Sequence, residues 1–353
     1  MEWLSDCCLM RSVYWWVAPV VLSIWVALAP AAHAAGRAYV SNEDGESVSV
    51  IDTGTNQVIA TIAVGKRPRG LKLNADGSLL YVAVSGLPKC PPTVPDAECA
   101  KLQRDLQADG IARIDTATLK VTRVLKSGSD PEQFDLSRDG RRLYVSNEDS
   151  AQATVLDTGT GSIIATIALG HEPEGVRVAP NGKWIIVTSE TDNALSLIDA
   201  QTLRVLKTIP VGVRPRDLAF TPDSHVAYVS GEGDASLTRV PIPAGAPATR
   251  ALQLGKTARP MGVVFDAAHQ RVYMTTGRGG TVAVIALQGG VEKLVTEIPV
   301  GARPWGIALS SDGQRLYTAN GSSNDVTVVD TSSLRVLKKI PVGQGPWGVV
   351  LGR

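Results

Sequence analysis

The chain has 353 residues, of which 44% are hydrophobic and 20% are charged, and its formal net charge is +1. This composition excludes a disordered chain, a collagen and a coiled coil. The balanced charge also argues against a general nucleic-acid binder, which would carry a basic surplus, so we expect no nucleic-acid partner.

The N-terminal segment is typical of a secretory signal peptide. Residues 13–28 form an apolar run that is shorter than the ~20 residues of a membrane-spanning helix. Ala32 and Ala34 follow this run in the small-x-small pattern of a cleavage site. We therefore predict that residues 1–34 are removed, that the mature protein is periplasmic or secreted, and that it has no stable membrane insertion. A retained N-terminal anchor is the alternative.

The translation start is open to two interpretations. Glu2 and Asp6 precede the first basic residue, Arg11, which is unusual for a signal peptide. A start at Met10 instead of Met1 would place a basic residue almost directly before the apolar run. The sequence leaves both starts open.

The rest of the chain consists of tandem repeats. Short segments of alternating polarity read as strands, beginning with residues 37–40, 47–52 and 58–64 and continuing with residues 70–73 and 80–83. One position marks the phase of the repeat every ~42 residues, apart from one longer interval. It falls at Tyr39, Tyr81, Tyr144, Ile186, Tyr228, Tyr273 and Tyr317.

Four strands in about 42 residues, repeated in tandem, predict the blades of a β-propeller. The chain begins at the second strand of a repeat and ends after a first strand, Gly348-Val-Val-Leu. The C-terminal strand should therefore complete the N-terminal blade and close the ring, which removes exposed sheet edges. We predict an all-β, seven-bladed β-propeller with four-stranded blades, formed by a single domain over residues 35–353, and a monomer.

An insertion interrupts the repeat at about residues 87–109. It is rich in proline and contains Cys90 and Cys99, the two cysteines that remain after residue 34. In an oxidising compartment these cysteines can form a disulfide that stiffens the loop, and a reduced pair is the alternative. Because long loops in compact domains often carry function, we expect a lid or a partner-docking arm here.

The repeats resemble those of the YVTN-type β-propeller family. The resemblance rests on Tyr39-Val-Ser-Asn, on Val48-Ser-Val-Ile-Asp, and on Ile-Pro-Val-Gly at residues 209–212, 298–301 and 340–343. In overall layout the chain is similar to periplasmic propellers associated with alcohol catabolism that depends on pyrroloquinoline quinone. That resemblance implies a periplasmic quinoprotein dehydrogenase or a cytochrome as the partner.

The loops that precede the first strands provide candidate binding residues. Each loop contains a proline, whose fixed φ suits the start of a strand, and the residues beside that proline vary between blades. The basic and tryptophan residues are Arg67, Arg69, Arg214, Arg216, Arg259, Arg303, Trp305 and Trp347. The acidic residues beside the prolines are Asp130, Glu132, Glu172 and Glu174. The loops between second and third strands, on the same face, add Glu43, Glu148, Glu190 and Glu232.

These side chains permit two interpretations. The acids and the arginines can form ion pairs between blades. Alternatively they form an anion-binding mouth, in which arginines bind carboxylates and Trp305 and Trp347 provide a flat apolar wall. A planar polycarboxylate such as pyrroloquinoline quinone would suit that mouth, as a ligand of this protein or through a partner enzyme.

Residue types for metal and nucleophilic chemistry do not cluster in the sequence. His171, His225 and His269 fall in three different repeats, the first on the face of the mouth and the other two on the opposite face. We therefore expect no zinc, copper or haem site, and we assign no catalytic residue. A calcium site on the acidic loops stays open.

Two functions remain. The first is a non-catalytic binding or interaction propeller that serves quinone-dependent alcohol or aldehyde catabolism. The alternative is a metal-independent, lactonase-type hydrolase that acts at the channel mouth. The sequence favours the first, because no residue departs from its repeat position in an apolar setting, as a general base would.

Overall fold

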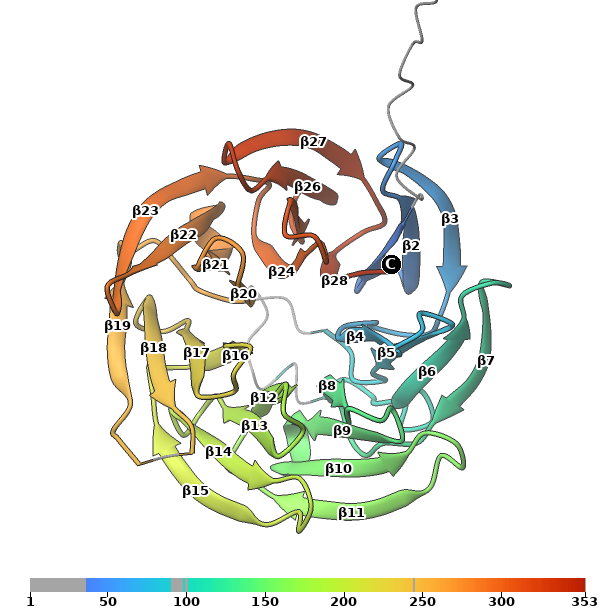
Figure 1. Cartoon of the computed structure of the whole chain (residues 1–353). Coiled ribbons are helices and arrows are strands. Elements are labelled where there is room, and N and C mark those ends of the chain that lie inside the picture. Colours follow the sequence, from blue (N-terminus) through green and yellow to red (C-terminus); the bar gives the residue numbers. More distant parts are fainter. Residues whose placement is uncertain (1–35, 90–97, 99–100, 244, 353) are drawn as a thin grey trace, which may run out of the picture. The chain divides into compact units, whose positions relative to one another are not determined.

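The computed structural model describes residues 36–89, 98, 101–243 and 245–352. Within them, 28 strands form seven four-stranded antiparallel sheets arranged as the blades of a ring, as Figure 1 shows. The predicted seven-bladed β-propeller is therefore confirmed. The predicted signal peptide and both Cys90 and Cys99 lie outside the described residues.

Each blade contributes one inner strand to the central axis, and three further strands follow it outward. The inner strands are β4 (Leu71–Leu73), β8 (Pro131–Leu136), β12 (Pro173–Val178), β16 (Pro215–Phe220), β20 (Val263–Asp266), β24 (Pro304–Leu309) and β28 (Pro346–Leu351). The second strands are β1 (Arg37–Asn42), β5 (Leu79–Val84), β9 (Arg142–Asn147), β13 (Trp184–Ser189), β17 (Val226–Gly231), β21 (Arg271–Thr275) and β25 (Arg315–Asn320).

The third strands are β2 (Ser47–Asp52), β6 (Gly110–Asp115), β10 (Gln152–Asp157), β14 (Ala194–Asp199), β18 (Ser236–Pro241), β22 (Thr281–Gln288) and β26 (Asp325–Asp330). The outer strands are β3 (Gln57–Ala63), β7 (Lys120–Leu125), β11 (Ile163–Ala168), β15 (Val205–Pro210), β19 (Thr249–Gln253), β23 (Val291–Pro299) and β27 (Arg335–Pro341). Two 3₁₀ turns, η1 (Glu148–Ser150) and η2 (Gly277–Gly279), follow second strands. We number the blades by their inner strands, from blade 1 (β4–β7) to blade 7 (β28 with β1–β3).

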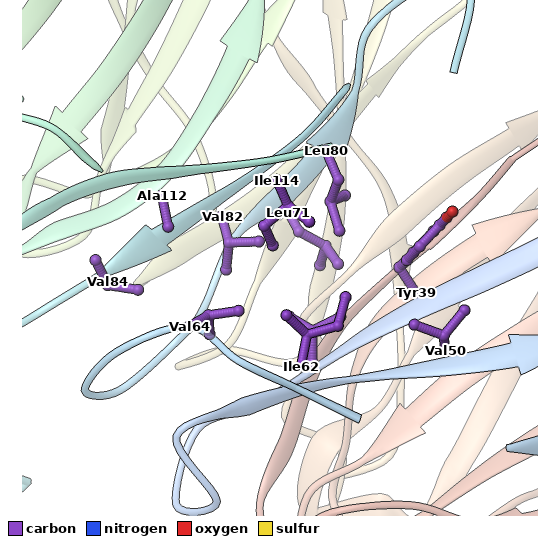
Figure 2. Close-up of a cluster of buried hydrophobic side chains, with 11 residues drawn as sticks. Tyr39, Val50, Ile62, Val64, Leu71, Leu80, Val82, Val84, Ala112 and Ile114 are labelled. Carbon is purple, nitrogen blue, oxygen red and sulfur yellow. The ribbon is translucent and has the colours of Figure 1, made fainter. Parts of the chain in front are cut away.

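The core lies between the blades. Seven clusters of buried apolar side chains each join one blade to the next. Figure 2 shows the cluster between blades 7 and 1, where Tyr39 and Ile62 face Leu71, Leu80 and Ile114. The tyrosines that mark the repeat belong to these clusters and are buried, so the phase marker is a packing residue. Removal of one such aromatic side chain would cost about 3 kcal/mol or more.

Ring closure follows the predicted arrangement. Strand β28 pairs antiparallel with β1, and Tyr39 lies opposite Val350 in the register. Blade 7, which contains the first three strands of the chain, is therefore completed by the last strand, and its sheet order is β28-β1-β2-β3. Among the described residues, no helix has the length and apolarity that a membrane crossing requires.

Deletion of residues 346–353 should abolish soluble folding, because it removes β28 from blade 7 and exposes β1 as an unpaired edge. Expression in the soluble fraction and a thermal melt would measure this effect. Deletion of Arg353 alone is the control and should leave the melting temperature unchanged. A soluble chain that lacks residues 346–353 and melts at the full-length temperature would contradict the closure.

Candidate functional site

The loops that carry the predicted site residues meet at one face of the ring, which we call the mouth. In every blade a proline begins or precedes the inner strand, and the residue after it occupies an equivalent position at the mouth. These seven mouth positions are Arg69, Glu132, Glu174, Arg216, Met261, Trp305 and Trp347. The repeat supplies the position and each blade supplies a different side chain.

Side-chain hydroxyls hold the backbone of the mouth positions from the neighbouring blade. The hydroxyl of Ser41 donates to the carbonyl of Arg69 at 2.6 Å, and that of Ser146 donates to the carbonyl of Glu174 at 2.6 Å. The same contact recurs from Thr188 to Arg216, from Ser230 to Met261 and from Thr275 to Trp305. In five of the seven blades, the serine or threonine two residues after the phase marker therefore positions the mouth of the next blade.

The acidic residues between second and third strands are held in the same repetitive way. The backbone N–H of Glu148, at the start of η1, donates to the carbonyl of Asp130 at 3.2 Å. The N–H of Glu190 bonds the carbonyl of Glu172 at 2.8 Å, and the N–H of Glu232 bonds that of Arg214 at 3.0 Å. Each acid is thus placed beside the residue that precedes the proline of its own blade.

Arg69 forms the first charged cluster of the mouth. Its side chain is 3% exposed and forms ion pairs with Asp130, Glu132 and Glu148, all from blade 2. The Glu148 contact measures 3.3 Å, and a further hydrogen bond reaches the carbonyl of Pro131 at 3.0 Å. One arginine of blade 1 therefore faces three carboxyl groups of blade 2.

Arg216 forms the second cluster. It pairs with Glu174 and Glu190 of blade 3, and its Nε donates to Glu232 of its own blade at 2.7 Å. Arg214 also pairs with Glu190 and lies 3.6 Å from Glu232, but its side chain is 51% exposed. The predicted ion pairs between blades are present, and the two central arginines are buried rather than solvated.

Because carboxyl groups outnumber arginines, their pKa values are driven apart. Burial and repulsion from Glu132 raise the pKa of Glu148 to about 8, against the attraction of Arg69. Burial opposes ionisation of Asp130 as well, but Arg69 and a hydrogen bond from Ser85 hold the pKa of that carboxyl below its usual range. A hydrogen bond joins Asp130 to Glu148, so the pair shares one proton, which Glu148 keeps at neutral pH.

The other two inward carboxyls behave like Glu148. Burial, with repulsion from Asp130, raises the pKa of Glu132. Burial also raises the pKa of Glu174 well above its ordinary value, and repulsion from Glu132 and Glu148 adds to it. The Arg69 and Arg216 clusters therefore act on one another across blades 2 and 3. Of these three carboxyls only Glu148 is partly exposed, at 29% of its side chain.

The opposite half of the mouth is apolar and basic. The rings of Trp305 and Trp347 lie 5.6 Å apart at an interplanar angle of 43°, and the Arg303 guanidinium lies 5.0 Å from the Trp305 ring centroid. No carboxylate of the described residues pairs with Arg303. These side chains, with Arg67 and Lys89, line a cavity of about 520 Å³ that we call the tryptophan pocket.

Arg67 connects the tryptophan pocket with the carboxyl clusters. Its guanidinium lies 3.0 Å from Glu43, and its charge also acts on Asp130 and Glu132. Lys89, in the described part of the insertion, bonds Glu43 at 3.0 Å. In contrast, Arg259 donates to backbone carbonyls of its own loop. This predicted mouth arginine therefore takes no part in the Arg69 and Arg216 clusters.

The described part of the insertion contacts the mouth face through charges. Arg104 pairs with Asp109 at 2.9 Å and with Asp149 of η1, which adjoins Glu148. Lys66 pairs with Asp105 at 2.9 Å. The predicted lid or docking arm at residues 87–109 stays a prediction, because residues 90–97 and 99–100 lie outside the described residues.

A central channel continues inward from the mouth. The sequence analysis did not predict a site in this channel. A cavity of about 540 Å³ is lined by inner-strand residues of all seven blades, from Glu174, Arg216 and the two tryptophans to Phe265 and Leu351. Its walls include Lys72, Asp135, Arg177 and Asp217. Strand alternation was the available signal, because these charges stand at inward positions where other blades carry Val, Ala or Gly.

The comparisons with known proteins agree with the seven-bladed propeller. Residues 105–232 match the model of the cytochrome D1 heme domain, and residues 207–344 match that of the seven-bladed β-propeller lactonases. A search of curated protein sequences finds no match. The two matched segments overlap over residues 207–232.

Solved structures share the fold at low sequence identity. A hydrazine synthase of Kuenenia stuttgartiensis is 22% identical with a TM-score of 0.71, over 83% of this chain and 92% of that one. A periplasmic gluconolactonase of Pseudomonas aeruginosa is 18% identical with a TM-score of 0.71, over 90% and 99%. A putative 6-phosphogluconolactonase of Bacteroides fragilis is 15% identical with a TM-score of 0.73, over 92% and 100%.

The cytochrome D1 match raises the question of haem, and the described lining does not fit it. Haem iron is held by His, Cys, Met or Tyr side chains. Of these types, only Met261 lines the channel among the described residues. His171, His225 and His269 lie in separate connections, in the three repeats where the sequence places them. Nor do three or more His, Cys, Asp or Glu side chains of the described chain form a metal-binding group.

Replacement of Arg69 by methionine should destabilise the protein by about 3–5 kcal/mol at pH 8, because buried carboxylates lose their cation. At pH 5 the loss should be smaller, since Glu148, whose pKa is raised to about 8, holds a proton there, and the raised pKa of Glu132 acts in the same direction. Denaturant unfolding at both pH values measures the difference. Arg335→Met, an exposed position on β27, is the control and should change stability by less than about 0.5 kcal/mol. An equal, small loss at both pH values would contradict the cluster.

The melting temperature should fall as pH rises from about 5.5 to about 9. Glu148 titrates near its ordinary pKa of 4.5 when unfolded and at about 8 when folded, so its stabilising proton is lost as pH rises through 8. The fall should reach at least about 2 °C and should shrink in Glu148→Gln. A melting temperature that is constant or rises over this range would show that Glu148 ionises normally.

Proposed function

We propose that this protein is a lactone hydrolase that acts at the mouth, with no metal in the reaction. The proposal rests on one observation above the others: Glu148 is a partly exposed carboxyl whose pKa is raised to about 8. A proton-transfer group works best when its pKa lies near the working pH. The lactonase family match and the gluconolactonase named among the similar structures favour this alternative over the non-catalytic role that the sequence favoured.

In the proposed lactone hydrolysis, Glu148 in the charged half of the mouth transfers the proton. Water adds its oxygen to the lactone carbonyl carbon while ionised Glu148 accepts a proton from that water. The bond from the carbonyl carbon to the ring oxygen then breaks, and Glu148 returns the proton to the departing oxygen. The product is a hydroxy acid, with all atoms of water and lactone retained.

Arg67 and the tryptophans would position the substrate. Arg67 lines the tryptophan pocket and also acts on the charges of Asp130 and Glu132, so its guanidinium can stabilise the oxyanion between the two halves. The faces of Trp305 and Trp347 offer an apolar wall for the C–H side of the ring.

The location and the interactions of the protein stay proposals. A signal peptide at residues 1–34 would export it to the periplasm, where Cys90 and Cys99 could pair. A quinoprotein dehydrogenase or cytochrome partner would be the setting for the non-catalytic alternative. Arg303 stacks on Trp305 and has no carboxylate partner among the described side chains, so it would bind a carboxylate of pyrroloquinoline quinone.

Purified protein should open five- or six-membered lactones, measured by proton release and corrected for spontaneous opening. Because the ionised form of Glu148 accepts the proton, kcat/KM should rise with pH to a plateau above about pH 8. Glu148→Gln should lower kcat/KM by about 10²-fold, with the fold intact. Glu46→Gln, an exposed acid of a mouth-face loop, is the matched control and should keep full activity.

No turnover over the whole lactone panel would overturn the proposal. If pyrroloquinoline quinone then quenched tryptophan fluorescence in the wild-type protein but not in Arg303→Ala, the binding role would replace the catalytic one. Turnover that Glu148→Gln leaves unchanged would retain a lactonase and remove Glu148 from its mechanism.

A further inference from the structure

The axial channel contains a charged layer below the mouth that the proposed hydrolysis does not use. Each blade contributes one inner-strand residue to this layer, and in every blade that residue lies opposite the phase marker of the second strand. The seven residues are Lys72, Asp135, Arg177, Ala219, Val264, Ala308 and Val350. Three adjoining blades therefore carry charges, and the other four carry small apolar side chains at the same level.

The carboxylates near this layer accept hydrogen bonds from backbone N–H groups in addition to their ion pairs with the cations. Asp135 accepts the backbone N–H of Val178 at 2.9 Å, besides its ion pair with Lys72 at 3.3 Å. Asp217 accepts the N–H of Leu218 at 2.8 Å, besides its pair with Arg177 at 2.8 Å. Both carboxylates are thus bound to the protein frame and are not free to hold a cationic ligand.

Arg177 is held by three partners. Its guanidinium donates to the side chain of Gln133 at 2.9 Å and to the carbonyl of Val176 at 2.8 Å, in addition to Asp217. Gln133 and Asp217 occupy positions where the other five inner strands have glycine, so two blades depart from the repeat to complete this network.

Lys72 is the exception in the layer. Its ammonium has three donors, and Asp135 is its partner among the described residues. The side chain is 29% exposed, more than Arg177 at 21%, Asp135 at 16% or Asp217 at 7%. Burial, with repulsion from Arg177, lowers the pKa of Lys72 despite Asp135, so the ammonium is under-solvated where it stands. A charge placed so at the wall of a cavity costs free energy unless another group solvates it.

We propose that the axial channel binds a monocarboxylate with an apolar body. The carboxylate accepts hydrogen bonds from Nζ of Lys72, and the body contacts Ala219, Val264, Ala308 and Val350 on the opposite wall. The cavity of about 540 Å³ suits a small molecule, because such sites measure about 300–1,000 Å³. The Lys72 ammonium, which has one protein partner among the described residues, binds a single negative charge, and the four apolar blades contact the body. The site is separate from Glu148 and does not depend on hydrolysis at the mouth.

Octanoate is the probe, and isothermal calorimetry with the full-length protein is the measurement. Octanoate should bind at one site per chain, whereas octylamine, of the same length and opposite charge, should not. Trp305 and Trp347 line the same cavity, so their fluorescence gives a second readout. Absence of octanoate binding, or equal binding of octylamine, would overturn the proposal.

Three variants locate the site. Lys72→Met should weaken octanoate binding at least about tenfold, since a charged hydrogen bond is lost. Ala308→Leu should weaken it as well, by filling the apolar side without changing any charge, so the test survives if Lys72→Met fails to fold. Lys183→Met, an exposed position, is the matched control and should bind like wild type. If Arg303→Ala abolished binding while Lys72→Met and Ala308→Leu retained it, the carboxylate would sit in the tryptophan pocket, and the channel proposal would be wrong.

Discussion

The mouth depends on a shortage of positive charge around two buried arginines. Arg69 faces Asp130, Glu132 and Glu148, and Arg216 faces Glu174, Glu190 and Glu232. Six ionised carboxylates could not be held at this density by two buried guanidinium groups, even with Arg67 and Arg214 nearby. Some carboxyls must therefore keep their protons, and the geometry decides which ones do. Asp130 gives up its proton because Arg69 and Ser85 solvate it, and Glu148 keeps one because burial and repulsion from Glu132 outweigh the attraction of Arg69.

The propeller makes this arrangement possible by separating the parts that hold the ring from those that vary. Buried tyrosines pack blade against blade, and serine or threonine hydroxyls hold the mouth backbone of the next blade. With the backbone fixed in this way, each blade can present a different side chain at the mouth. Blades 1–4 present the charged clusters, and blades 6 and 7 present the tryptophans. The result is a mouth with a proton-transfer side and an apolar side. The channel below it likewise has a charged side and an apolar side.

The fold could be predicted from the sequence because its signal is repeated seven times. The tyrosine phase, the turn residues and the position of the C-terminal strand each indicate the same ring, so an error in one repeat is corrected by the others. The mouth residues could be predicted for the same reason, since the prolines mark them. What the sequence could not show is how deeply each side chain lies. Arg69 and Arg67 read alike beside one proline, yet one is buried among three carboxylates and the other lines an open pocket. The raised pKa of Glu148 arises from that difference in burial and from contacts between blades. Lys72 was missed although strand alternation places it inside, because its importance depends on the six other blades at the same level.

At neutral pH Glu148 carries a proton while its neighbour Asp130 does not. Carbon-13 NMR of the side-chain carboxyl groups over a pH titration would measure both protonation states, with Glu148→Gln to assign the resonance. We expect a glutamate carboxyl resonance that titrates near pH 8 and is absent from the variant, while no aspartate titrates in that range. If every glutamate carboxyl titrated near its ordinary value of 4.5, the proton at the mouth would be absent and the account would be contradicted.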